Sequence, residues 1–117
     1  MWQITLKEND LVAGLKASDF KDALTKLVGM IPDWRLGPKM KKDVFQLLVD
    51  RERIGTTAIG GGVALPHCLS EDVREPIVMF GVSPDGLACP SLDGYPVHFI
   101  FMLLLPKDEQ AELRKRS

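Results

Sequence analysis

The sequence predicts a single α/β domain, and three observations indicate this class. Residues 97–105 form a nearly continuous apolar run, which is typical of a strand covered on both faces. Two segments upstream carry apolar residues at the 3.6-residue spacing of helices. With 117 residues, of which 45% are apolar and 26% charged, the chain has the length and composition of one globular domain, residues 1–117.

Charge and cysteine content argue against several functional classes. Fifteen basic and sixteen acidic residues give a net charge of −1, so nothing attracts the whole chain to nucleic acid or to an anionic membrane. Two cysteines are too few for a disulfide framework, and the first residues lack the pattern of a secretory signal. The longest apolar run is about half the length of a membrane-spanning helix. We expect a cytoplasmic protein with no membrane insertion and no nucleic-acid partner.

The first third of the chain predicts a strand and a helix. Residues 11–15 could form a short first strand. Ser18 or Asp19 can cap a helix that ends before Pro32. The apolar stripe of this helix consists of Phe20, Leu24, Leu27, Val28 and Ile31.

A second helix is predicted from Pro38, which suits a first helical turn, to Gly55, which is placed as the C′ residue. Its apolar stripe consists of Met40, Val44, Leu47 and Leu48. Arg51 continues this stripe and should point toward the core, whereas Glu52 and Arg53 turn aside. Two interpretations of Arg51 stay open: interaction with the helix dipole, with a buried stem, or binding of an anion.

The rest of the chain predicts short strands joined by turns. An acidic surface loop is expected at residues 70–75, and turns are expected at residues 83–86 and at Asp93-Gly94. Asp108 is placed to cap a last helix that begins near residue 107. The expected extended segments are residues 56–59, 63–65, 77–82 and 97–105.

The segment that leads to His67 concentrates the residues with chemical potential. Gly60, Gly61 and Gly62 can take up positive φ and bring backbone N–H groups close to an anion. Pro66 restricts the backbone, so we expect His67 to sit on a stiff turn. Neutral imidazole is nucleophilic, so a histidine beside an anion-binding loop predicts phosphoryl chemistry. The alternative is a structural or merely exposed histidine.

His98 lies in the most apolar strand, where its ring needs a hydrogen-bond partner. It is either a satisfied core histidine or, if the strand ends beside the His67 loop, a group that binds phosphate or orients the His67 ring. The two histidines and Cys68 match no usual zinc pattern, and the glycines lack the spacing of a nucleotide P-loop. We therefore expect no metal and no cofactor.

A long motif resembles the enzyme IIA domains of the fructose/mannitol type, including the nitrogen-regulatory members, of the bacterial phosphoenolpyruvate-dependent phosphotransferase system. The motif comprises RERIGTTAIGGGVALPH at residues 51–67, PIVMFGV at residues 76–82 and PVHFIFMLLLP at residues 96–106. The resemblance implies a three-layer α/β/α sandwich with a small mixed β-sheet. It also implies further helices after the last strand, which this chain lacks, so we expect a C-terminally truncated form with an uncovered sheet face that favours a homodimer.

The resemblance also implies roles for individual residues. His67 would accept a phosphoryl group from the phosphohistidine of HPr, or of its nitrogen-branch relative, and pass it to a cysteine of a IIB domain. Arg51, sixteen positions upstream, would be an active-site arginine, and His98 would correspond to a second active-site histidine. With Arg51, backbone N–H groups of residues 60–62 would stabilise the phosphate oxygens. Cys68 stands where the family often has glycine.

Two functions follow from this resemblance. The first is a phosphocarrier in sugar uptake, which acts as a phosphotransferase through a phosphohistidine intermediate. The alternative is a stand-alone nitrogen-regulatory IIA protein whose His67 phosphorylation state controls binding to protein partners.

Overall fold

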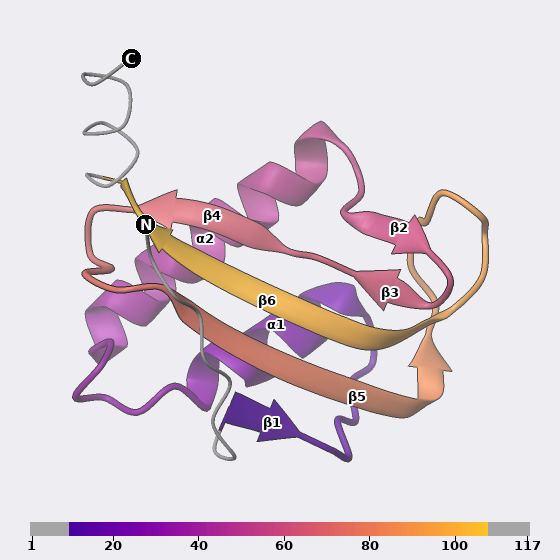
Figure 1. Cartoon of the computed structure of the whole chain (residues 1–117), viewed down its shortest axis with the longest axis horizontal. Coiled ribbons are helices and arrows are strands. Elements are labelled where there is room, and N and C mark those ends of the chain that lie inside the picture. The colour runs from indigo at the N-terminus through magenta and orange to yellow at the C-terminus, as the bar shows by residue number, and fades with distance from the viewer. Residues whose placement is uncertain (1–9, 108–117) are drawn as a thin grey trace.

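The computed structural model describes residues 10–107 (Figure 1). These residues form a mixed sheet of six strands and two helices. The elements are β1 (Leu11–Val12), α1 (Phe20–Gly29), α2 (Pro38–Ile54), β2 (Ala58–Gly60), β3 (Val63–Ala64), β4 (His67–Ser70), β5 (Ile77–Leu87) and β6 (Val97–Pro106). The predicted α/β class with a mixed sheet is confirmed.

Strand β6 is the centre of the sheet. Along one edge it pairs antiparallel with β5, and β5 in turn pairs parallel with β1. Along its other edge β3 and then β4 follow one another, both parallel to β6 (Figure 1). Strand β2 extends this side by pairing antiparallel with β3. The most apolar segment of the sequence therefore pairs with three other strands, which explains why nearly all of its residues are apolar.

The helices and the sheet form two layers within the described residues. Both helices lie behind the sheet in the view of Figure 1. Along residues 77–83 of β5 and 100–106 of β6 the side chains alternate between buried and half-buried, because one face of the sheet packs on the helices. The continuous hydrophobicity of β6 predicted cover on both faces, and the helix layer covers one of them. The helix predicted to begin near residue 107 lies almost entirely outside the described residues.

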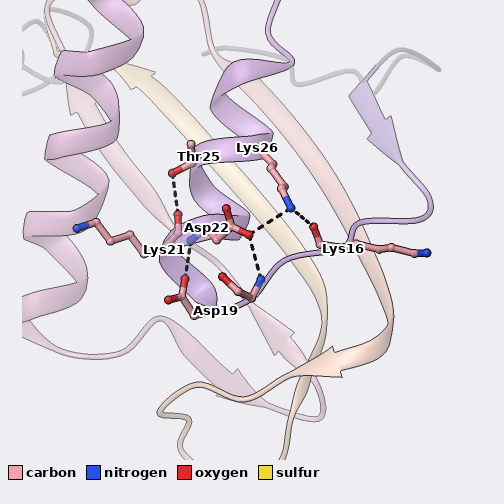
Figure 2. Close-up of polar contacts among 7 residues, drawn as sticks. Lys16, Asp19, Lys21, Asp22, Thr25 and Lys26 are labelled. Atoms are coloured by element: carbon pink, nitrogen blue, oxygen red, sulfur yellow. Dashed lines mark hydrogen bonds and ion pairs between the residues drawn. The ribbon is translucent and has the colours of Figure 1, made fainter.

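Helix α1 begins as the sequence predicts. The side chain of Asp19 accepts a hydrogen bond from the Asp22 N–H at 2.7 Å, and the carboxylate of Asp22 accepts one from the Ser18 N–H at 3.0 Å (Figure 2). The helix then packs closely on β5 at Gly81, where an added Cβ would lie 3.2 Å from a Leu27 methyl carbon. The cap thus fixes the start of the helix, and the glycine lets it approach the sheet.

Helix α2 has the predicted bounds but a different buried face. Val44 and Leu48 are fully buried, whereas Met40 is 42% exposed and Leu47 is 39% exposed. Phe45 and Glu52, which are not part of the predicted apolar stripe, are half-buried. The inner face of the helix is therefore rotated toward these positions. The prediction that Glu52 turns aside is therefore wrong. Gly55 does end the helix, but with φ 172° it is extended and not left-handed.

Two strand predictions need correction. His67 is the first residue of β4, a strand that the sequence did not predict, because its pairing with β6 and not its own composition defines it. The predicted turn at residues 83–86 lies inside β5, which continues to Leu87. A register shift between Val82 and Leu87, with Gly86 at φ 80°, absorbs these turn-forming residues as a bulge.

Candidate functional site

His67 lies at the start of β4, directly after buried Pro66, and its side chain is exposed. Its Nδ1 lies 2.8 Å from the backbone oxygen of Leu65. A carbonyl oxygen can only accept a hydrogen bond, so this contact assigns the ring proton to Nδ1. In the neutral ring Nε2 then carries the free electron pair on an exposed side chain, which is what a nucleophile requires.

The carbonyl that holds His67 belongs to a segment anchored on the end of α2. The N–H of Leu65 donates to the backbone oxygen of Thr57 at 3.0 Å. Buried Thr57 donates its own N–H to a carboxylate oxygen of Glu52 at 3.2 Å, and its hydroxyl donates to the other carboxylate oxygen. A chain of hydrogen bonds therefore runs from Glu52 to the His67 ring.

Arg51 occupies the last turn of α2 and is half-buried. Its Nη1 donates to the backbone oxygen of Gly55 at 2.9 Å, so in this conformation the guanidinium satisfies a carbonyl just beyond the helix C-terminus. Among the described residues no hydrogen bond joins Arg51 to His67. Arg51 is nevertheless the direct neighbour of Glu52, where the hydrogen-bond chain to His67 begins.

Gly60 ends β2, Gly61 and Gly62 form the turn to β3, and all three have positive φ, at 104°, 64° and 78° respectively. Their conformation is the one that the sequence predicts. The N–H of Gly61, however, already donates to the carboxylate of Asp93 at 2.8 Å. An internal carboxylate thus stands where a phosphate was expected, and the hydrogen bonds from Gly61 and Tyr95 lower the pKa of Asp93.

His98 lies near the glycine turn and away from His67. Its Nδ1 lies 3.0 Å from the backbone oxygen of Ser83, and its ring also borders Gly62 and Gly86. His67 pairs with Leu103, which is five residues beyond His98 along β6. At about 3.3 Å per residue, the two histidines lie roughly 16 Å apart along the strand. The structure therefore does not bring His98 to the ring of His67.

The cysteines offer no metal ligand set or reactive thiol. Burial raises the pKa of the Cys68 thiol to about 11. Burial also raises the pKa of Cys89, and the negative charge of Glu52 adds to this shift. Within residues 10–107 no group of three His, Cys, Asp or Glu side chains could hold a metal ion. No helix in the same range is long and apolar enough to cross a bilayer.

Sequence reasoning missed Glu52, Thr57 and Asp93 as neighbours of the candidate residues. A glutamate in the last turn of a helix faces the negative end of the helix dipole, which is unfavourable unless the side chain has another partner. The position of Glu52 in the last turn of the predicted helix could therefore have indicated that its side chain has another partner. Asp93 contacts Gly61 across 32 residues, and no local pattern reveals such a contact.

Comparison with known proteins identifies the family. Residues 5–115 match the family model described as "Phosphoenolpyruvate-dependent sugar phosphotransferase system, EIIA 2". A nitrogen regulatory protein of Bradyrhizobium diazoefficiens is 32% identical over 102 residues, which cover 87% of this chain and 65% of the relative. The chain thus spans less than two thirds of the length of this curated relative.

Solved structures have the same fold. The nitrogen regulatory protein IIA-Ntr of Neisseria meningitidis is 26% identical with a TM-score of 0.79, and the match covers 92% of this chain and 72% of that one. IIAMTL of Escherichia coli, solved in complex with phosphorylated IIBMTL, is 17% identical with a TM-score of 0.75 and coverage of 95% and 77%. The match over residues 5–115 shows that the chain belongs to the EIIA type 2 family of the phosphoenolpyruvate-dependent sugar phosphotransferase system.

Proposed function

We propose that this chain is a phosphocarrier and that Nε2 of His67 accepts the phosphoryl group. The observation that carries the proposal is the contact between His67 Nδ1 and the Leu65 carbonyl, which in the neutral ring places the free electron pair on the exposed Nε2 side. Family membership supports phosphoryl transfer as the reaction class. The donor is an HPr-type protein that carries a phosphohistidine.

In the proposed reaction the Nε2 electron pair of His67 forms a new N–P bond as the N–P bond of the donor breaks. The electron pair of the broken bond returns to the donor ring, and His67 keeps its Nδ1 proton on the Leu65 carbonyl. Transfer of this kind depends mainly on positioning and on electrostatic stabilisation of the phosphate oxygens. Arg51 is our candidate for that stabilisation, once its guanidinium leaves the Gly55 carbonyl.

Intact-mass spectrometry tests the acceptor. The chain is incubated with phosphoenolpyruvate, enzyme I and HPr, and part of each sample is then treated with acid, which breaks a P–N bond. We expect one acid-labile phosphate on the wild type and none on His67→Ala. His98→Asn is the matched control, because its amide can still donate to the Ser83 carbonyl, and it should be labelled like the wild type. A folded wild type that takes up no phosphate would contradict the proposal.

Two fates of the phosphoryl group are consistent with His67 as acceptor. Transfer to a cysteine of a IIB domain is supported by the family and by the IIB-bound form of the similar Escherichia coli protein. Regulation of a protein partner is supported by the relative named nitrogen regulatory protein. Loss of phosphate on addition of a IIB domain supports the carrier, whereas a partner captured in only one phosphorylation state supports the regulator.

A further inference from the structure

Glu52 carries a charge at a place where the helix disfavours it. It lies in the last turn of α2, and the negative end of the helix dipole repels a carboxylate there. Glu52 nevertheless packs inward, where both its oxygens accept hydrogen bonds from Thr57. The hydrogen bonds with Thr57, and not the stability of the helix, therefore explain why Glu52 lies at this position.

Thr57 is 4% exposed and connects Glu52 to the segment before His67. Its backbone oxygen accepts the N–H of Leu65 at 3.0 Å, and the next residue, Pro66, has no N–H with which to make a second such bond. On the other side, the Pro66 oxygen accepts the N–H of Leu103 at 2.9 Å. The peptide units around Leu65 are thus fixed from two directions, by α2 through Thr57 and by β6.

We propose that Glu52 is a positioning residue for His67. By holding Thr57 it fixes the Leu65 carbonyl, and this carbonyl keeps the His67 proton on Nδ1 and the electron pair on Nε2. This inference rests on the proposed function of His67 as the phosphoryl acceptor. Glu52 does not touch the phosphate, and it acts only through the ring that does. The arrangement extends the rule that a hydrogen bond to one histidine nitrogen determines which nitrogen reacts.

The tautomer of His67 tests the proposal before any phosphate is present. Nitrogen-15 NMR of histidine-labelled, unphosphorylated protein distinguishes a protonated Nδ1 from a protonated Nε2. We expect the Nδ1–H form in the wild type and a mixture of both tautomers in Glu52→Ala and Thr57→Val, because these variants lose both or one of the hydrogen bonds to Glu52 that hold residue 57, whose backbone oxygen accepts the Leu65 N–H. Thr57→Ser keeps the hydroxyl and both hydrogen bonds, so it should restore the wild-type spectrum.

The rate of phosphorylation by phospho-HPr provides the second measurement. We expect Glu52→Ala and Thr57→Val to be phosphorylated about ten-fold more slowly, by analogy with the lower end of the loss that follows removal of the hydrogen-bond partner of a metal-ligating histidine. Glu75→Gln, at an exposed glutamate in the loop after β4, is the matched control and should change neither the tautomer nor the rate. If Glu52→Ala unfolds, Glu52→Leu takes its place, because leucine fills similar space and cannot accept either hydrogen bond from Thr57.

Folded Glu52 and Thr57→Val variants that keep the Nδ1–H form would overturn the proposal. A wild type that shows the Nε2–H form would overturn it as well. Failure of the proposed function is a separate result, since it appears as a wild-type protein that HPr does not phosphorylate, whereas the tautomer is measured without phosphate.

Discussion

Asp93 supplies the anion for the glycine turn. One of its carboxylate oxygens accepts the Gly61 N–H, and the other accepts the Tyr95 N–H at 3.1 Å. A Cβ at Gly60 would lie 3.1 Å from the same carboxylate, so the close approach requires glycine there. The turn therefore connects the β2–β3 hairpin to the loop that precedes β6.

We expect Asp93→Asn to destabilise the protein at neutral pH. Because hydrogen bonds lower the pKa of Asp93 in the folded state, its contribution to stability is present above the unfolded pKa and is lost as pH falls through the folded pKa. Urea unfolding from pH 7 down to about pH 3 measures this, and the difference between variant and wild type should shrink with acid. A difference that stays constant over this range would contradict the assignment.

The two thiols should react slowly and in a fixed order. Cys89 is half-buried and Cys68 is buried with a pKa raised to about 11, so iodoacetamide at neutral pH should modify Cys89 first. Because the charge of Glu52 helps to raise the Cys89 pKa, Glu52→Gln should speed alkylation of Cys89 and leave Cys68 unchanged. Peptide mass spectrometry gives both rates in one sample. Equal acceleration of both cysteines would indicate loosening of the fold.

At the scale of elements, the cap of α1 is the clearest case in which sequence and structure agree. Asp19 caps the helix by accepting a hydrogen bond from the N–H of Asp22 in the first turn, and Lys26 forms an ion pair with the Asp22 carboxylate at 3.2 Å (Figure 2). All three positions lie within one local segment, so the pattern is visible in the sequence.

Asp19→Ala should lower the free energy of unfolding by about 1 kcal/mol, because the Asp22 N–H loses its acceptor. Asp19→Asn is the matched control, since its amide oxygen can still accept this hydrogen bond, and it should cost less. Denaturant unfolding of the three proteins measures both values. Equal losses in the two variants would show that the charge, and not the hydrogen bond, stabilises the helix.

Elements with strong local signals could be predicted, and elements defined by their neighbours could not. The helices and β6 have long apolar patterns or caps, and all of them were expected. Strand β4 has four residues and exists because β6 lies beside it, while β5 continues through turn-forming residues because pairing with β6 resumes at Leu87. At the candidate site, the sequence motif identifies His67. The contacts of Glu52 with Thr57 and of Asp93 with Gly61 form only when the chain folds, so the motif does not predict them.

At the scale of the whole molecule, the sheet face opposite the helices is apolar. The rings of Phe80 and Phe101 stack there with centroids 4.4 Å apart, and Phe80 also stacks with Phe99, which is 41% exposed. Strand β4 pairs His67 with Leu103 and Leu69 with Leu105 on β6. Since paired residues of parallel strands point to the same face, His67 lies on the edge of this apolar face.

We propose that this apolar face takes part in the self-association that the sequence predicts. Sedimentation velocity over a range of protein concentrations should show a monomer–dimer equilibrium. Phe99→Ser should weaken the dimer with little loss of stability, because the Phe99 side chain is already partly exposed. A wild-type protein that stays monomeric at all concentrations would contradict this prediction.

The proposed phosphoryl transfer is defined by which nitrogen of His67 bonds to phosphorus. The most direct test is NMR of the phosphorylated protein labelled with nitrogen-15 in histidine, in which coupling to phosphorus-31 identifies the bonded nitrogen. We expect the coupling at Nε2 of His67, with Nδ1 still protonated on the Leu65 carbonyl. Coupling at Nδ1, or phosphate on His98, would show that the hydrogen bond from His67 to Leu65 does not determine the acceptor.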